Sequence, residues 1–187
     1  MLFRSKSQAS LKINILNKFT EETELPDYLN PCLDGKNVGL LSEAGCPAIA
    51  DPGAEIVKIA HQKEIQVVPL VGPSSILLAL MSSGMNGQNF AFNGYLPIEK
   101  SERKSALKQL ERLSFEKKQT QIFIETPYRN NKMLEDICAS LNVHTRVCVA
   151  CDITLPTEYI KTQTVKEWKH TTVDLHKRPS IFIIQKD

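Results

Sequence analysis

The sequence predicts an α/β protein of two domains, the first with a parallel sheet and the second with a mixed sheet. In the first half, short aliphatic runs alternate with apolar residues at helical spacing, an order typical of parallel strands joined by crossover helices. In the second half, the last strand-like segments follow one another with almost no helix between them, which favours antiparallel pairing. The 187 residues, 42% of them hydrophobic, are enough for one large core or two small ones.

Composition and charge point to a soluble globular protein and narrow its partners only slightly. A net charge of +2 permits RNA binding but does not argue for it. No apolar run approaches the ~20 residues that a membrane helix needs, and no apolar region of a signal peptide follows the first residues. We therefore expect no membrane contact and a cytoplasmic location.

The five cysteines are odd in number and scattered, so reduced thiols are expected. Cys148 and Cys151 have the spacing of a metal-binding or redox pair. They lie in an extended pattern, however, and no second Cys/His pair accompanies them. Buried structural thiols are the favoured interpretation over zinc or redox use, and no metal site is expected.

The first half is expected to contain three strands and three helical segments. Apolar and β-branched runs predict the strands, and apolar residues at helical spacing predict the helices. Gly and Pro clusters mark the turns between them. The strands are expected at 12–16, 38–41 and 65–70, a short irregular or helical piece at 25–33, and helices at 54–61 and 76–81.

The most informative stretch runs from Val38 to Gly53, where a short strand enters a loop rich in small residues and then a helix. Gly45 permits a backbone angle that other residues resist. Asp51 is expected to cap the helix, with Pro52 at its first position. Loops at the carboxyl end of a parallel strand are where open α/β sheets bind ligands. A strand–helix connector without a ligand would have the same pattern, so both interpretations stay open.

We place a domain boundary between Tyr95 and Glu99, giving domains of residues 1–95 and 96–187. There an alternation of aromatic and small residues ends in Gly and Pro, and a highly charged segment follows at 99–118. Apolar residues recur in this segment at helical spacing, which predicts an amphipathic helix. Its charged side is either a solvated face or a basic face that contacts RNA.

The second half predicts strands at 120–125, 145–151, 158–165 and 180–185, with a helix at 127–141. Thr126 and Pro127 again combine a capping residue with proline at a helix start. Glu125 to Arg129 is therefore a second strand-to-helix junction with polar groups at the end of a strand. Two α/β halves with such junctions are expected to enclose a cleft.

Four motifs occur in a characteristic order, at Ser42–Gly53, Val68–Ser74, Phe92–Pro97 and Glu125–Arg129. Together they resemble the tetrapyrrole methylase superfamily of S-adenosylmethionine-dependent methyltransferases. Their details are similar to the branch that contains the bacterial 16S rRNA (cytidine 2′-O)-methyltransferases. The resemblance implies a homodimer that binds S-adenosylmethionine in the cleft between its domains and acts on ribosomal RNA. It begins just before the family's third strand, so the first domain is expected to be incomplete relative to the family.

The resemblance also implies which residues contact the methyl donor. Backbone groups and small side chains of the first loop would line it, the second motif would lie beside it, and the second domain would approach from the other side. The final strand would lie near the adenine. These positions are Gly45, Cys46, Pro47, Ile49, Ser74, Ser75, Ile76, Ile124, Glu125, Pro179 and Ser180.

Methyl transfer from a sulfonium needs the nucleophile and the methyl carbon aligned, about 3–3.5 Å apart. A hydroxyl nucleophile also needs a proton acceptor. Glu43 is the candidate for that role, and the alternative is a solvated loop carboxylate. Ser74 and Ser75 are either donor contacts or helix caps. Glu125 is either a donor contact or only the partner of Arg129, four residues further on.

Three functions follow as hypotheses. The first is methylation of a ribose hydroxyl of small-subunit ribosomal RNA. The second keeps the donor but takes a tetrapyrrole-like or other small molecule as acceptor. The third is a truncated domain that binds a ligand or partner without catalysis.

Overall fold

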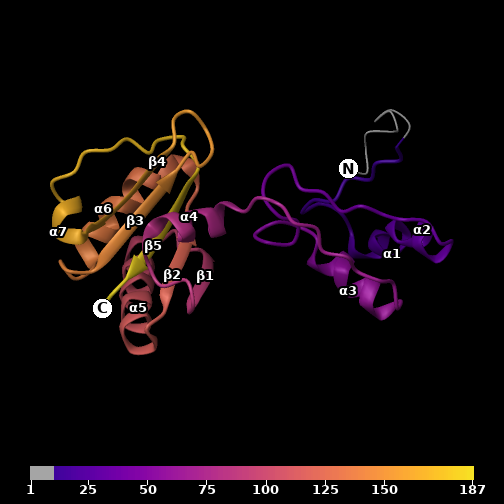
Figure 1. The fold of residues 1–187 in the computed structure, drawn as a ribbon, viewed down its shortest axis with the longest axis horizontal. Coiled ribbons are helices and arrows are strands. Elements are labelled where there is room, and N and C mark those ends of the chain that lie inside the picture. Colours follow the sequence, from indigo (N-terminus) through magenta and orange to yellow (C-terminus); the bar gives the residue numbers. More distant parts are fainter. Residues whose placement is uncertain (1–10) are drawn as a thin grey trace. The chain divides into compact units, whose positions relative to one another are not determined.

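The computed structural model describes residues 11–187, and it divides into two compact units between Pro73 and Ser74 (Figure 1). The first unit ends at Pro73, and the second runs from Ser74 to Asp187. This division lies upstream of the boundary expected between Tyr95 and Glu99. The reason is that the helix after Pro73 packs its apolar side on the sheet of the second unit.

In its described residues, the first unit contains short helices around a small core. A 3₁₀ turn, η2 (Glu22–Glu24), leads into α1 (Leu25–Tyr28) and α2 (Asn30–Leu33), and α3 (Ala54–Gln62) follows after a long loop. The short helical piece expected at 25–33 and the helix expected at 54–61 are thus present. Their buried core consists of Leu25, Leu29, Ile56 and Ala60.

The parallel sheet expected in the first domain is not formed in residues 11–73. The segments at 12–16, 38–41 and 65–70 contain no ladder hydrogen bonds in the structure. Parallel strands need both faces covered, but the side chains that would face a core are exposed, such as Val68 at 63% and Leu70 at 75%. The prediction of strands at these three positions is therefore wrong for this structure, because too little apolar surface covers them.

The second unit is built on one five-stranded sheet with the order β1-β2-β5-β3-β4. Only β1 and β2 pair in parallel, and every other pair is antiparallel, so the predicted mixed sheet is confirmed. All four strands expected after residue 119 are present. The strands are β1 (Phe90–Tyr95), β2 (Thr120–Ile124), β3 (Arg146–Cys151), β4 (Tyr159–Thr164) and β5 (Ser180–Gln185).

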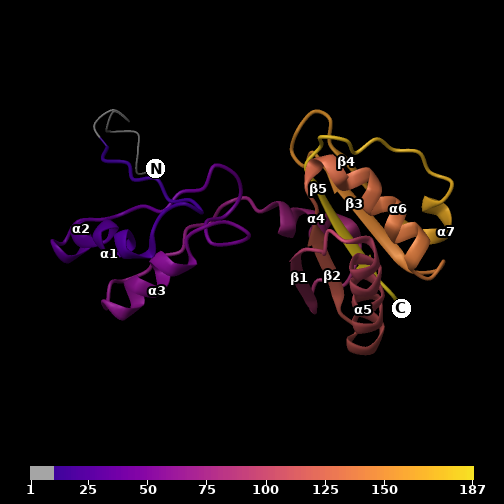
Figure 2. The same ribbon diagram turned by 180° about the vertical axis from the view of Figure 1, so that it is seen from behind.

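Helices cover both faces of this sheet. On one face α5 (Lys100–Lys117), α6 (Asn130–Ser140) and α7 (Val165–Trp168) enclose the larger core, in which Phe123 and Phe182 stack with ring centroids 5.8 Å apart. On the other face, α4 (Ser75–Ser83) is the one helix of the second unit that packs on the sheet. Figures 1 and 2 view the sheet from its two sides, with α4 on one face and α5 and α6 on the other.

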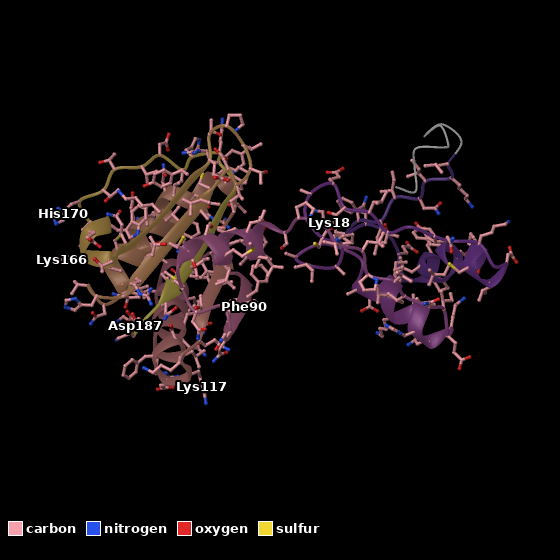
Figure 3. The ribbon with its side chains drawn as sticks, viewed as in Figure 1. Lys18, Phe90, Lys117, Lys166, His170 and Asp187 are labelled. Atoms are coloured by element: carbon pink, nitrogen blue, oxygen red, sulfur yellow. The ribbon has the colours of Figure 1, made fainter. Side chains whose placement is uncertain are left out.

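The two edges of the sheet are β1 and β4. Phe90 begins β1, whereas Lys166 and His170 lie in and just after α7, which follows β4 (Figure 3). Trp168 of α7 is buried, and its indole Nε1 donates to the Val147 carbonyl at 2.9 Å. Trp168 therefore packs α7 against the sheet.

Side chains alternate between the two faces of the sheet along β3, and this places its two cysteines on opposite faces. Cys148 packs with the α4 face, and Cys151 packs with the α5–α6 face. Residues three apart on a strand point to opposite faces, so these two thiols cannot bind one ion together. Burial raises the pKa of both thiols, which agrees with their interpretation as buried structural thiols. Among the described residues, no helix has both the length and the apolar character needed to cross a membrane.

Candidate functional site

One end of the second unit's sheet gathers several of the residues expected to bind the methyl donor. Ile124 ends β2 and pairs with Ile181 of β5. Ser180, which begins β5, pairs with Cys151 at the end of β3. The antiparallel register therefore places Ile124, Glu125 and Ser180 at the same end of the sheet, with the exposed Pro179 just outside it.

The N-terminus of α4 lies at this end too. Near the other end of α4, the Thr162 hydroxyl of β4 donates to the Ser83 carbonyl at 2.7 Å, and near its start Ile76 packs in a cluster with Ile181. Ser74 occupies the N-cap position, but its side chain makes no capping hydrogen bond. The first N–H groups of a helix have no partner within the helix. They are thus available at this end of the sheet, beside the exposed Ser75.

Glu125 carries a buried charge at the end of β2. Its side chain is 1% exposed, and Oε1 accepts hydrogen bonds from Arg129 Nη2 and from the Thr126 N–H, both at 2.6 Å. Burial acts to raise the pKa of Glu125, but the Arg129 and Thr126 hydrogen bonds outweigh it, and the net pKa lies below the ordinary value of 4.5. The expected pairing with Arg129 is therefore present. Thr126 stands at the N-cap of the 3₁₀ turn η3 (Pro127–Arg129), without a side-chain cap.

A second ion pair at this end of the sheet was not anticipated from the sequence. Arg178 Nε donates to Asp152 Oδ2 at 2.7 Å, and Nη2 donates to the Thr157 carbonyl at 2.6 Å. The Arg178 carbonyl accepts from Asn130 Nδ2 at 2.6 Å. Arg178 thereby fixes the segment before Ser180 to the loop after β3. The partners are 26 residues apart, so only the sheet register reveals them.

The loop of the first motif, Ser42–Gly53, has part of the predicted backbone conformation. Gly45 has a φ of +78°, the left-handed conformation predicted for it. The Cys46 thiol lies 3.5 Å from the Pro73 carbonyl and 4.0 Å from the Gly72 carbonyl, within hydrogen-bond reach for sulfur. This contact brings the first motif beside the second. Pro47 is half-buried, whereas Ile49 is 54% exposed and Glu43 is exposed.

The capping prediction for Asp51 is wrong. Helix α3 begins at Ala54, and its N-cap is Gly53, with a φ of +142°. The Pro52 carbonyl accepts the Ala48 N–H at 3.3 Å, and the first helical bond runs from the Val57 N–H to the Gly53 carbonyl. The loop thus closes on itself at Pro52 before the helix starts.

Replacing Gly53 with alanine is expected to destabilise the first unit by about 1–3 kcal/mol. A Cβ there would lie 2.9 Å from Leu40 Cδ2 and 3.3 Å from the Ala48 nitrogen, in a backbone conformation that alanine resists. Hydrogen exchange of the amides at 48–57 measures the effect. Gly45→Ala is the control for the clash, because Gly45 also has a positive φ but its Cβ would meet open space. An equal effect of the two substitutions would contradict the steric argument.

A cavity of about 260 Å³ lies in the first unit. None of the eleven positions expected to contact the methyl donor lines it. Its walls come from Leu16, Asn17, Thr20, Glu22, Leu25, Asp51, Pro52, Gly53, Ala54, Glu55 and Ile56. The expected site residues therefore form two groups. One is the loop of the first unit, and the other is the sheet end of the second, while the cleft itself stays a prediction.

The chain resembles named proteins over most of its length. Ribosomal RNA small subunit methyltransferase I of Buchnera aphidicola subsp. Schizaphis graminum is 32% identical over 172 residues, which is 90% of this chain and 59% of the relative. Its namesake in Vibrio cholerae serotype O1 is 33% identical over 152 residues, covering 81% of this chain and 51% of the relative. That of Escherichia coli O157:H7 is 32% identical over 173 residues, covering 91% and 59%. The chain thus spans about half to three fifths of the length of these relatives.

Two solved structures share the fold. The methyltransferase CobJ superimposes with a TM-score of 0.63 at 14% identity, over 98% of this chain and 78% of that one. The cobalt precorrin-4 methyltransferase CbiF gives a TM-score of 0.56 at 16% identity, over 90% and 72%. The family described as Tetrapyrrole (Corrin/Porphyrin) Methylases matches residues 14–169, which include parts of both units. The chain belongs to the tetrapyrrole methylase family.

Proposed function

We propose that this chain takes part in S-adenosylmethionine-dependent methylation of a ribose hydroxyl in small-subunit ribosomal RNA. The observation that carries the proposal is the name shared by its relatives, ribosomal RNA small subunit methyltransferase I, at 32–33% identity over 152–173 residues. The four ordered motifs support the same reaction.

The polar groups at the sheet end of the second unit suit such a donor. S-adenosylmethionine supplies an activated methyl group on a sulfonium, so no metal or covalent intermediate is needed. The free N–H groups at the start of α4 can donate to its polar groups. Glu125 is buried and paired with the partly exposed Arg129 at the end of β2, and this pair is the proposed donor contact from the second unit. Backbone groups of Gly45 and Cys46 complete the proposed donor contacts.

In this proposal the chain mainly orients the reacting groups. Alignment of a nucleophile with the methyl carbon supplies about 7–11 kcal/mol of the barrier in favourable cases. A ribose hydroxyl must also lose its proton during the transfer. Glu43 is the proposed acceptor, since it is exposed on the loop that carries Gly45 and Cys46.

Transfer of a labelled methyl group to small ribosomal subunits that lack the modification tests the function. We expect label in the RNA, at a ribose, and binding of S-adenosylhomocysteine by calorimetry. Glu43→Gln is expected to lower the transfer rate at least 100-fold while leaving the calorimetric affinity unchanged. Donor binding without transfer to any acceptor would favour a non-catalytic domain, and no donor binding would overturn the proposal.

A second acceptor class is favoured by the family description itself, which names corrin and porphyrin methylases. The same labelled donor, offered with a tetrapyrrole in place of ribosomal subunits, separates the two. Label in the small molecule alone would replace the RNA proposal with this one.

We further propose that the protein acts as a homodimer in the cytoplasm. The family resemblance supports the dimer, and the ribosomal substrate supports the location. Light scattering of the purified chain measures its mass in solution. A monomer at working concentration would contradict the dimer, and fractionation with the membrane would contradict the location.

A further inference from the structure

Three lysines form a row along the exposed side of α5. Lys100, Lys104 and Lys108 recur every four residues, and all three are exposed. Each step of four residues advances about 6 Å along the helix and turns by only about 40°. The three ammonium groups therefore follow one another along the exposed flank beside the buried stripe that contains Leu107 and Leu110. We call these residues the α5 lysine row.

The fold offers this row no counter-charge. Within residues 11–187, no acidic side chain lies within salt-bridge distance of Lys100, Lys104 or Lys108. Like charges four residues apart destabilise a helix. A destabilising local arrangement that no other contact in the fold offsets is expected at functional positions.

The arginines of the second unit have carboxylate partners, whereas most of its lysines have none within salt-bridge distance in the described part of the chain, and the row is set apart from these by its regular spacing along one helix. Arg103, Arg129, Arg146 and Arg178 each have a carboxylate partner at 2.5–3.0 Å. On α5 itself Arg112 lies 3.9 Å from Glu116. Glu111 accepts from the Asn142 N–H at 2.7 Å, so its carboxylate is engaged away from the row.

The row starts at the end of the sheet where the candidate site lies. Tyr95 of β1 pairs with Ile124 of β2, so both parallel strands end there, and α5 begins five residues after Tyr95. Tyr95 is 62% exposed at this point. Exposed aromatic rings are the surfaces on which unpaired bases stack. Lys100 is thus the member nearest to the candidate site, and the row leads away from it.

We propose that the α5 lysine row binds the phosphate backbone of the RNA acceptor and guides one segment of it toward the candidate site. This rests on the proposed function, which supplies an RNA acceptor. Evenly spaced, unpaired ammonium groups suit a polymer that carries one negative charge per nucleotide, because each contact releases a condensed counterion. Phosphate contacts of this kind position RNA without reading its sequence.

The test compares two triple variants of the full chain with equal loss of charge. In one, Lys100, Lys104 and Lys108 become glutamine. In the matched control, three exposed lysines become glutamine: Lys161 of β4, Lys166 of α7 and Lys169 at the C-cap of α7. Binding to a fluorescent fragment of protein-free small-subunit rRNA is measured from 0.05 to about 0.5 M salt. Donor binding by calorimetry and thermal melting verify that each variant is folded.

For the row variant we expect about 100-fold weaker RNA binding at about 0.1 M salt, and a slope of log affinity against log salt that is shallower by about 2. The control is expected to change affinity less than about 3-fold. Equal weakening of both variants would mean that only net charge matters and would overturn the proposal. Binding of the wild type to anionic lipid vesicles but not to RNA would overturn it as well.

Together with the methyl-transfer assay, this experiment separates the inference from the function on which it rests. If the wild-type chain neither binds nor methylates RNA, the proposed function fails and this inference fails with it. If the wild type methylates RNA and the row variant binds it as tightly, only the role of the row is contradicted.

Discussion

Replacing Asp136 with alanine is expected to lower the free energy of unfolding of the second unit by about 3–5 kcal/mol. Its carboxylate accepts from Arg103 at both Nε, 2.9 Å away, and Nη2, 2.5 Å away. The two side chains are only 7% and 8% exposed. Without Asp136, Arg103 would keep a charge in a buried place with no carboxylate. Thermal or urea unfolding measures the loss, which corresponds to a fall in Tm of roughly 10–20 °C.

The neighbouring Glu135 provides the matched control. It lies on the same helix and pairs with Lys132 at 2.7 Å, but its side chain is 66% exposed. Exposed pairs contribute about 0–1 kcal/mol, so Glu135→Ala is expected to have little effect. The double variant Arg103→Met with Asp136→Leu is expected to recover much of the lost stability, since no charge is left buried. A loss below about 1 kcal/mol for Asp136→Ala would contradict the assignment of a buried ion pair.

Replacing Arg129 with alanine is expected to lower the free energy of unfolding by about 2–3 kcal/mol at neutral pH. The reason is that Glu125, with its side chain 1% exposed, loses its guanidinium while the Thr126 N–H remains. The effect lies below the range for fully buried pairs because Arg129 is itself 35% exposed. Unfolding by urea at pH 7 measures it, and Arg129→Lys, which keeps the charge, is the control.

The stability difference between the wild type and Arg129→Ala is expected to change with pH, whereas the difference caused by a simple packing defect would not. In the wild type the pKa of Glu125 is lowered below 4.5, so its contribution to stability is present above that pH and is lost as the pH falls through the lowered value. In Arg129→Ala, burial would dominate and raise the pKa of Glu125. The variant would then regain stability relative to the wild type as the pH falls from 7 toward 4.5. A gap that stays constant with pH would count against a buried carboxylate at this position.

Much of the second unit could be predicted from the sequence, because its strands and helices are long enough to show their periodicity. The helix at 99–118 and the strands after residue 119 were recognisable on that basis. The ion pairs Arg103–Asp136 and Asp152–Arg178 were not. The first joins α5 to α6 across 33 positions, and the second joins segments next to β3 and β5 across 26 positions. No local pattern records such a pairing.

The first unit shows where local pattern misleads. The segment at 65–70 has the composition of a strand, but a strand exists only where another strand and a covering layer are available to it. The Asp51-Pro52 pair likewise has the composition of a helix start, and the hydrogen bond between Ala48 and Pro52 moves that start to Ala54. At the candidate site, Gly45 and the Glu125–Arg129 pair followed from residue type, whereas the convergence of Ser180, Ile124 and α4 required the topology.

The place of β5 in the sheet has a consequence for how the protein is made. It is the last of the strands in residues 11–187, but it lies between β2 and β3 and hydrogen-bonds to both. As the chain leaves the ribosome, the parallel pair β1–β2 and the antiparallel pair β3–β4 stay two separate halves of the sheet, each with an apolar edge, until Ser180–Gln185 has emerged. Such late, non-local closure slows folding and leaves nascent chains open to aggregation. A stalled or shortened translation product would therefore depend on chaperones for its survival.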